Sequence, residues 1–165
     1  MHAQRNRIQV YGLPRSGTNF VEWSLVNNFK NLEYKNYYSE PEITEIPRSN
    51  VAIKHNFPSL NNSEFCIVIF KEWTLFSSSY KKWSGRDLNK ETYDLYLSKA
   101  KKLDPNRCLI FNHSWLCENY NLGLQMISDK FRVRLNDKII QPMNSLDKNG
   151  ANAKQKKNKF ILKKS

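Results

Sequence analysis

Cysteine and histidine are scarce in this sequence, and it contains no long apolar run. The 3 cysteines include no CxxC pair and the 3 histidines are scattered without ligand spacing, which argues against a zinc site. No window reaches the about 18 consecutive apolar residues of a membrane-spanning helix. The opening residues, MHAQRNRIQV, lack the apolar core of a secretory signal peptide. We therefore expect a cytoplasmic protein with reduced thiols, no membrane span and no bound metal.

Acidic residues are also few, and this imbalance indicates an anionic partner. The chain has 15 Asp and Glu against 27 Lys and Arg, which gives a formal net charge of +12. Such a field attracts nucleic acid, acidic lipid, or a polyanionic cofactor or substrate. The stretch KNGANAKQKKNKFILKKS, from about residue 148, contains no acid and is interpreted as a solvated basic tail. With 165 residues, of which 39% are hydrophobic and 13% aromatic, we expect a single domain over 1–165.

Short apolar runs alternate with helical patterns along the chain. The runs predict strands at 7–12, 50–55, 65–71 and 107–112. Helical patterns lie at about 20–29, 74–83, 90–103 and 114–131, the last with Ser114 as its N-cap. Residues 31–49 are interpreted as an irregular connection. The run FCIVIFK is apolar almost without alternation, as in a parallel strand that is buried on both faces. The alternation of elements predicts an α/β fold, with a mostly parallel central sheet flanked by helices.

The stretch VYGLPRSGTNF has the layout of a strand, a phosphate-binding loop and a helix. Gly12 and Gly17 bracket four residues at the spacing of a P-loop, and loop amides with a helix N-terminus bind phosphate or sulfate. A nucleotide hydrolase would continue with Lys and then Ser or Thr for Mg²⁺, whereas this chain has Thr18 and Asn19. The positive charge stands inside the loop instead, at Arg15. We therefore expect a P-loop-like site for an anion without a metal.

This loop resembles the 5′-phosphosulfate loop of the sulfotransferases that use 3′-phosphoadenosine 5′-phosphosulfate (PAPS). In that family a strand leads into Pro, a basic residue, Ser-Gly-Thr, a polar residue and an aromatic, as GLPRSGTNF does here. The resemblance implies that the aromatic, Phe20, packs on the adenine. It also implies that the 5′-phosphosulfate is held by Arg15, Ser16, Gly17, Thr18 and Asn19.

A second segment is similar to the family's 3′-phosphate site. There a buried strand ends in Arg and a Ser stands eight residues later, and here FCIVIFK ends in Lys71 with Ser79 at that spacing. Lysine thus replaces the family's Arg, and Trp73 replaces a Pro two residues further on. Lysine neutralises phosphate as a point charge, and its hydrogen bonds are less directional than those of Arg. The resemblance implies that Lys71 and Ser79 bind the 3′-phosphate.

A third segment, AIKHNFP, resembles the place where many soluble sulfotransferases carry a Lys and a catalytic His shortly before a Pro, although the spacing differs by one residue. The resemblance implies that His55 takes the proton from the acceptor and that Lys54 offsets charge on the leaving nucleotide. Other branches of the family place a glutamate base on the helix after the loop. Glu22 lies near that position, and it equally fits a surface acid that complements the helix dipole. His113 is interpreted as a local capping or packing residue.

These residues predict a sulfotransferase that moves a sulfuryl group from PAPS to a hydroxyl or amine acceptor without a metal and releases adenosine 3′,5′-bisphosphate. The acceptor would be a small molecule or a carbohydrate. Two alternatives stay open. A basic nucleic-acid-binding or interaction protein could share the fold, although the aromatics do not alternate with Lys and Arg as in a stacking platform. A P-loop phosphotransferase would need a lysine after Gly17 and an Asp near Phe70, and this chain has neither.

Overall fold

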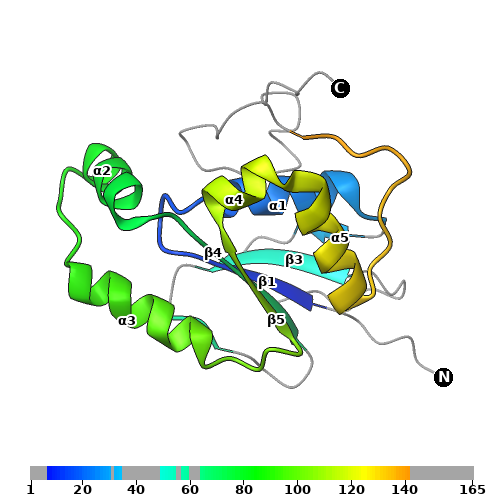
Figure 1. The fold of residues 1–165 in the computed structure, drawn as a ribbon, viewed down its shortest axis with the longest axis horizontal. Helices are drawn as coiled ribbons and strands as arrows, with labels where there is room; N and C mark the ends of the chain where they lie inside the picture. Colours follow the sequence, from blue (N-terminus) through cyan, green and yellow to red (C-terminus); the bar gives the residue numbers. More distant parts are fainter. Residues whose placement is uncertain (1–6, 31, 35–48, 55–56, 60–63, 142–165) are drawn as a thin grey trace.

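Parallel strands form the central sheet in the part of the chain that the structure describes (Figure 1). This computed structural model describes residues 7–30, 32–34, 49–54, 57–59 and 64–141. The strands are β1 (Arg7–Tyr11), β2 (Leu32–Tyr34), β3 (Ser49–Lys54), β4 (Glu64–Phe70) and β5 (Cys108–Asn112). Their order across the sheet is β2-β3-β1-β4-β5, and each neighbouring pair is parallel. The sheet expected from the sequence is confirmed.

Helices cover both faces of this sheet. They are α1 (Thr18–Asn28), α2 (Trp73–Ser84), α3 (Lys90–Lys101), α4 (His113–Glu118) and α5 (Tyr120–Phe131). Figure 1 shows α1, α4 and α5 on one face and α3 on the other, with α2 at the end where the chain leaves β4. The α/β architecture is therefore confirmed. Among the described residues, no helix is both long and apolar enough to cross a membrane.

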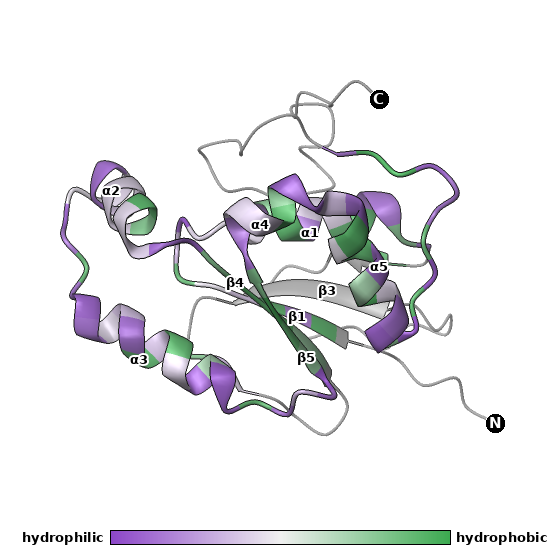
Figure 2. Ribbon diagram, viewed as in Figure 1, coloured by the Kyte–Doolittle hydropathy of each residue, from purple (hydrophilic) through white to green (hydrophobic). Residues whose placement is uncertain are grey.

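Two apolar clusters, one on each face of the sheet, hold these layers together. Ile67 and Ile69 of β4 pack with side chains of β1, α1 and α5. Cys66 and Val68 alternate with them and pack with Tyr96 of α3. All four strand residues are 0% exposed, as expected for a parallel strand covered on both faces. Figure 2 shows β4 and β5 as the apolar centre of the molecule. Each fully buried Ile or Val contributes about 1.5–3 kcal/mol.

The segment 31–49, predicted as an irregular connection, contains a strand. The three residues of β2 pair with Ser49, Asn50 and Val51 of β3. A strand of three residues is too short to show a two-residue alternation of apolar and polar side chains. The prediction is therefore wrong for this part of the connection.

The helical pattern at 114–131 forms two helices rather than one. They meet at Asn119, whose backbone is not helical (φ −119°, ψ 43°). The first of them begins at His113, directly after β5, so Ser114 lies in the first turn and not at the N-cap. The N-cap is Asn112, whose Oδ1 accepts hydrogen bonds from the backbone amides of Ser114 (2.9 Å) and Trp115 (3.3 Å).

Candidate anion-binding site

The candidate site lies at the carboxyl edge of the sheet, where the chain leaves two neighbouring strands toward opposite faces. After β1 the loop Gly12–Gly17 leads to α1, and after β4 Lys71 leads to α2 and α3. Strands β1 and β4 pair directly, with Tyr11 opposite Val68. In open parallel sheets, ligands bind in the crevice at such a switch point. The topology therefore places the predicted loop and the predicted phosphate lysine at one crevice.

A tight turn presents Arg15 in this loop. The backbone amide of Ser16 donates to the carbonyl of Leu13 (3.1 Å), which closes a turn with Pro14 and Arg15 at its centre. Arg15 has φ 74°, and the pattern of Pro followed by a positive φ is that of a type II turn, which favours glycine at this position. A side chain in this left-handed region costs about 1–2 kcal/mol. Residues with a strained backbone are common at functional sites. The positive φ of Arg15 is therefore a reason to expect a functional role for this residue.

The amino end of α1 is open toward the loop. Gly17 precedes the helix with φ 104°, and no described side chain caps it by a hydrogen bond. The first turn holds no acidic residue. Asparagines, by contrast, cap α3 and α4. The first backbone amides of α1 therefore keep their hydrogen-bonding capacity and the positive end of the helix dipole for a ligand.

Basic groups converge beside this open helix end. Burial lowers the pKa of Lys71 below 10.5, and the charge of Arg15 lowers it further, while the Cys117 thiol acts in the opposite direction. Burial and the charge of Lys71 lower the pKa of His113 from 6.5 to about 4. Each of these basic groups thus acts electrostatically on the next, and the pairing of β1 with β4 places the ends of the two strands side by side. An anion bound there would relieve the repulsion.

The imidazole of His113 is packed against the loop. A Cβ on Gly17 would lie 2.5 Å from Cδ2 of His113, so only glycine allows the ring to approach so closely. The ring meets Phe20 edge-on at 5.2 Å between centroids, and Cys117 Sγ lies 3.7 Å from Nε2. His113 is 9% exposed. His113 is therefore a packing residue, as one of the two interpretations predicted. The other interpretation, a capping residue, is wrong because Asn112 is the N-cap of α4.

The backbone of Lys71 is held from the α3 side of the sheet. The hydroxyl of Tyr93 donates to the carbonyl oxygen of Lys71. Tyr93 is buried, and its ring packs with Trp73 and stacks on Phe76, with centroids 5.1 Å and 5.4 Å away. Burial raises the pKa of Tyr93, so this hydroxyl keeps its proton at neutral pH. The backbone of Lys71 is therefore fixed by a side chain of α3, whereas Arg15 is fixed by the turn that Leu13 and Ser16 close.

The other residues implied by the family resemblance lie at different depths around the loop. Ser16 and Thr18 are buried and Asn19 is half-buried. Phe20 is 1% exposed between His113 and Tyr120, so its ring is a core residue and, as placed, offers no open face to an adenine.

The remaining predicted residues lie further from the loop or are not described. Ser79 is half-buried in the middle of α2. Glu22 is 0% exposed, so its interpretation as a surface acid is wrong. Lys54 ends β3 directly opposite Tyr11, at the same edge of the sheet as the loop. His55 lies outside the described residues.

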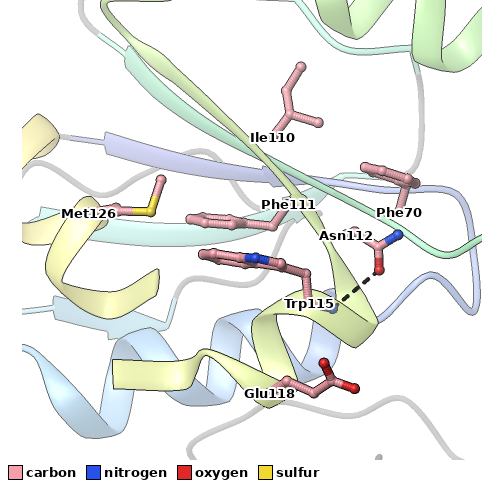
Figure 3. A pocket seen from close by; sticks show the side chains of 7 residues that line it. All are labelled: Phe70, Ile110, Phe111, Asn112, Trp115, Glu118 and Met126. Atoms are coloured by element: carbon pink, nitrogen blue, oxygen red, sulfur yellow. Dashed lines mark hydrogen bonds between the residues drawn. The ribbon is translucent and has the colours of Figure 1, made fainter. Parts of the chain in front are cut away.

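An open pocket of about 570 Å³ adjoins this crevice on the β5 side (Figure 3). Phe70 and Asn112, which precede Lys71 and His113 in the chain, pair across β4 and β5 and both line it. Its walls also include the rings of Phe111 and Trp115, which stack with 6.0 Å between their centroids and an angle of 14° between their planes. The full lining is Phe70, Ile110, Phe111, Asn112, Trp115, Glu118 and Met126. The pocket suits a flat, apolar group with a polar edge.

The arrangement of these elements matches that of a solved enzyme. The crystal structure of mouse sulfotransferase SULT7A1 complexed with PAP superposes with a TM-score of 0.58 at 14% sequence identity. The fold is sulfotransferase-like. The match covers 82% of this chain and 62% of that one, so this chain spans about three fifths of the length of the mouse protein. No protein-family model matches the sequence, and no curated protein matches it.

Proposed function

We propose that this protein binds PAPS and transfers its sulfuryl group to a hydroxyl or amine acceptor. The observation that carries the proposal is the convergence of Arg15, Lys71 and the open amino end of α1 at one crevice of a sulfotransferase-like fold. These groups fit a ligand with separate anionic centres. The ligand PAP (adenosine 3′,5′-bisphosphate) in the mouse structure supports the same reading.

The residues divide between the two ends of such a nucleotide. Arg15, the amides of the loop and the hydroxyls of Ser16 and Thr18 would hold the 5′-phosphosulfate, with Asn19 beside them. Lys71 would neutralise the 3′-phosphate, with Ser79 as its proposed partner. A planar guanidinium donates two parallel hydrogen bonds, whereas an ammonium acts as a point charge. The more directional group thus stands at the end of the ligand where a bond would break.

The chemistry asked of the protein is charge stabilisation and one proton transfer. Bound PAPS would supply the sulfuryl group. Arg15 and the α1 amides would stabilise the negative charge that develops around the transferring group, and no metal is needed for this. His55 would accept the acceptor's proton, with Glu22 as the alternative base, and Lys54 would offset charge on the leaving phosphate. Glu22 is 0% exposed, a position that does not suit a base that must reach an acceptor.

Calorimetric titration with adenosine 3′,5′-bisphosphate and with ADP, each with and without Mg²⁺, tests the proposal. We expect the bisphosphate to bind more tightly than ADP and to be indifferent to magnesium. Arg15→Ala should weaken binding about tenfold to a hundredfold. Arg132→Ala, which changes an exposed arginine at the end of α5, should leave it unchanged. Tighter binding of ADP with Mg²⁺ would indicate a phosphotransferase, and binding of neither nucleotide would contradict the proposal.

Nucleic-acid binding on the same fold is the second candidate, and α2 carries the observation that favours it. Trp83 is 54% exposed, and it lies next to the exposed Lys81 and Lys82 on the helix. An exposed indole beside cations is a stacking platform for single-stranded nucleic acid. In this case Trp83→Ala would weaken binding of a fluorescent oligonucleotide about tenfold or more. The same substitution should leave bisphosphate binding unchanged if sulfuryl transfer is the function.

A further inference from the structure

The imidazole of His113 forms one wall of the loop, although the family resemblance gives it no role. The ring edge with Cδ2 and Nε2 faces Gly17, since a Cβ there would lie 2.5 Å and 3.4 Å from these atoms. Phe20 of α1 covers the ring on another side, and the thiol of Cys117 lies 3.7 Å and 3.9 Å from Nε2 and Nδ1. The ring is therefore held from the loop, from α1 and from its own helix, with Cδ2 nearest to the glycine and Nε2 as the nearer of its two nitrogens.

The charge that acts most directly on this ring is that of Lys71, and α1, which packs on the ring through Phe20, also carries the buried carboxyl of Glu22. On the β4 side Lys71 acts on His113 directly, and Arg15 in the loop acts on Lys71. On α4 the titratable neighbour is the Cys117 thiol. On α5 the hydroxyl of Tyr120 is engaged by the amide of Asn28 (2.9 Å), and burial raises its pKa. Without an anion, protonation of His113 would thus add a third positive charge at the loop.

We infer that His113 is a binding residue of the anion site and that it takes up one proton from solvent when a multiply charged anion occupies the loop. An anion beside Gly17 reverses the local field, because its charge outweighs the repulsion from Lys71. The protonated imidazole then adds a third positive charge beside the anion. The inference rests on the anion site of the proposed function, but it does not depend on sulfuryl transfer.

This proton uptake makes the affinity of the loop depend on pH. With one proton taken up per anion, the affinity falls by up to about tenfold for each pH unit between the pKa of the free site, about 4, and the higher pKa of the occupied site. Between these two pKa values the uptake should approach about one proton per anion. A multiply charged anion would bind most tightly under mildly acidic conditions.

Histidine NMR on the wild-type full chain with sodium sulfate tests the inference. Sulfate stays doubly charged across the range from about pH 4.5 to 7.5, so proton uptake is not confused with titration of the ligand. Sodium chloride at equal ionic strength is the control. His113→Gln identifies the resonance among the 3 histidines. We expect sulfate, but not chloride, to raise the pKa of His113, and the sulfate affinity of His113→Gln to lose its pH dependence.

The outcomes separate this inference from the proposed function. If sulfate binds in an Arg15-dependent way and the pKa of His113 stays unchanged, the inference is overturned while the anion site stands. If sulfate raises this pKa but adenosine 3′,5′-bisphosphate does not bind, the inference is supported and the proposed function fails. If neither anion binds, both are refuted. The central measurement uses wild-type protein, so it does not depend on how well the variant folds.

Discussion

Replacing Arg15 with glycine should give a more stable protein than replacing it with alanine, and both substitutions should weaken anion binding. Arg15 has φ 74°, a conformation that costs a side chain about 1–2 kcal/mol and costs glycine little. Glycine loses more backbone freedom on folding, which offsets about 0.5–1 kcal/mol of this gain. Relative to Arg15→Ala, which also lacks the guanidinium, the net stabilisation is about 0.5–1 kcal/mol. For a domain of this size it corresponds to a rise in Tm of about 1–4 °C.

The loss of binding has a separate origin. Arg15→Gly removes a charged donor, and a charge-assisted hydrogen bond is worth about 1.5–3 kcal/mol. The affinity for adenosine 3′,5′-bisphosphate should therefore fall about tenfold to a hundredfold. Differential scanning calorimetry and urea unfolding measure the gain in stability of the ligand-free protein, and calorimetric titration measures the loss of affinity.

Two control variants separate backbone strain from charge. Arg15→Ala removes the guanidinium but keeps a Cβ in the left-handed region, so it should lose affinity without gaining stability. Arg132→Gly is the converse control, because Arg132 also has a positive φ (54°) and lies exposed at the end of α5. It should gain stability and keep its affinity. If Arg15→Gly is no more stable than Arg15→Ala, the argument from strain is refuted. If it binds the bisphosphate as wild type does, the assignment of Arg15 is refuted.

Further predictions concern the neighbours of Arg15. Gly17→Ala should lower the free energy of unfolding by about 2–4 kcal/mol, because it combines a strained φ of 104° with a clash against His113; urea unfolding measures it, and an unchanged midpoint would contradict the close packing. His113→Ala should recover part of this loss in the double variant. The pKa of His113 is lower in the folded state (about 4) than its ordinary 6.5, so stability is full above pH 6.5 and falls by up to about 3 kcal/mol as the pH drops toward 4. Urea unfolding at several pH values checks this, and His113→Gln should remove that part of the pH dependence. Lys71→Arg should keep bisphosphate binding at alkaline pH, where the wild type loses it because the pKa of Lys71 is lowered. Calorimetric titration at several alkaline pH values measures this. If both proteins lose affinity at the same pH, Lys71 does not bind the phosphate.

The loop and the strands other than β2 could be predicted because their signals are local. The apolar run of β4 indicates a strand covered on both faces, and the spacing of Gly12 and Gly17 indicates a phosphate-binding turn. The position of Arg15 inside that turn is likewise visible in the sequence. These features depend on neighbours within about ten residues, where side-chain periodicity and glycine geometry act directly.

The contacts of His113 and Phe20 could not be predicted in this way. His113 reaches Gly17 because β5 lies beyond β4 in the sheet and α4 starts at the carboxyl edge, which is a matter of strand order. Phe20 is buried because α4 and α5 pack over α1, whose buried residues lie all around the helix and show no single apolar face. The signal that could have indicated His113 is its position at the end of a parallel strand, at the same edge as the loop.

The crevice takes its two cationic side chains from the ends of two neighbouring strands. Arg15 stands in the loop that follows β1 and leads to α1, while the backbone of Lys71, which follows β4, is fixed by Tyr93 of α3. A ligand that contacts both would link these two segments across the paired strands. Its binding should then slow amide exchange in β1 and β4 together, and not in the loop alone.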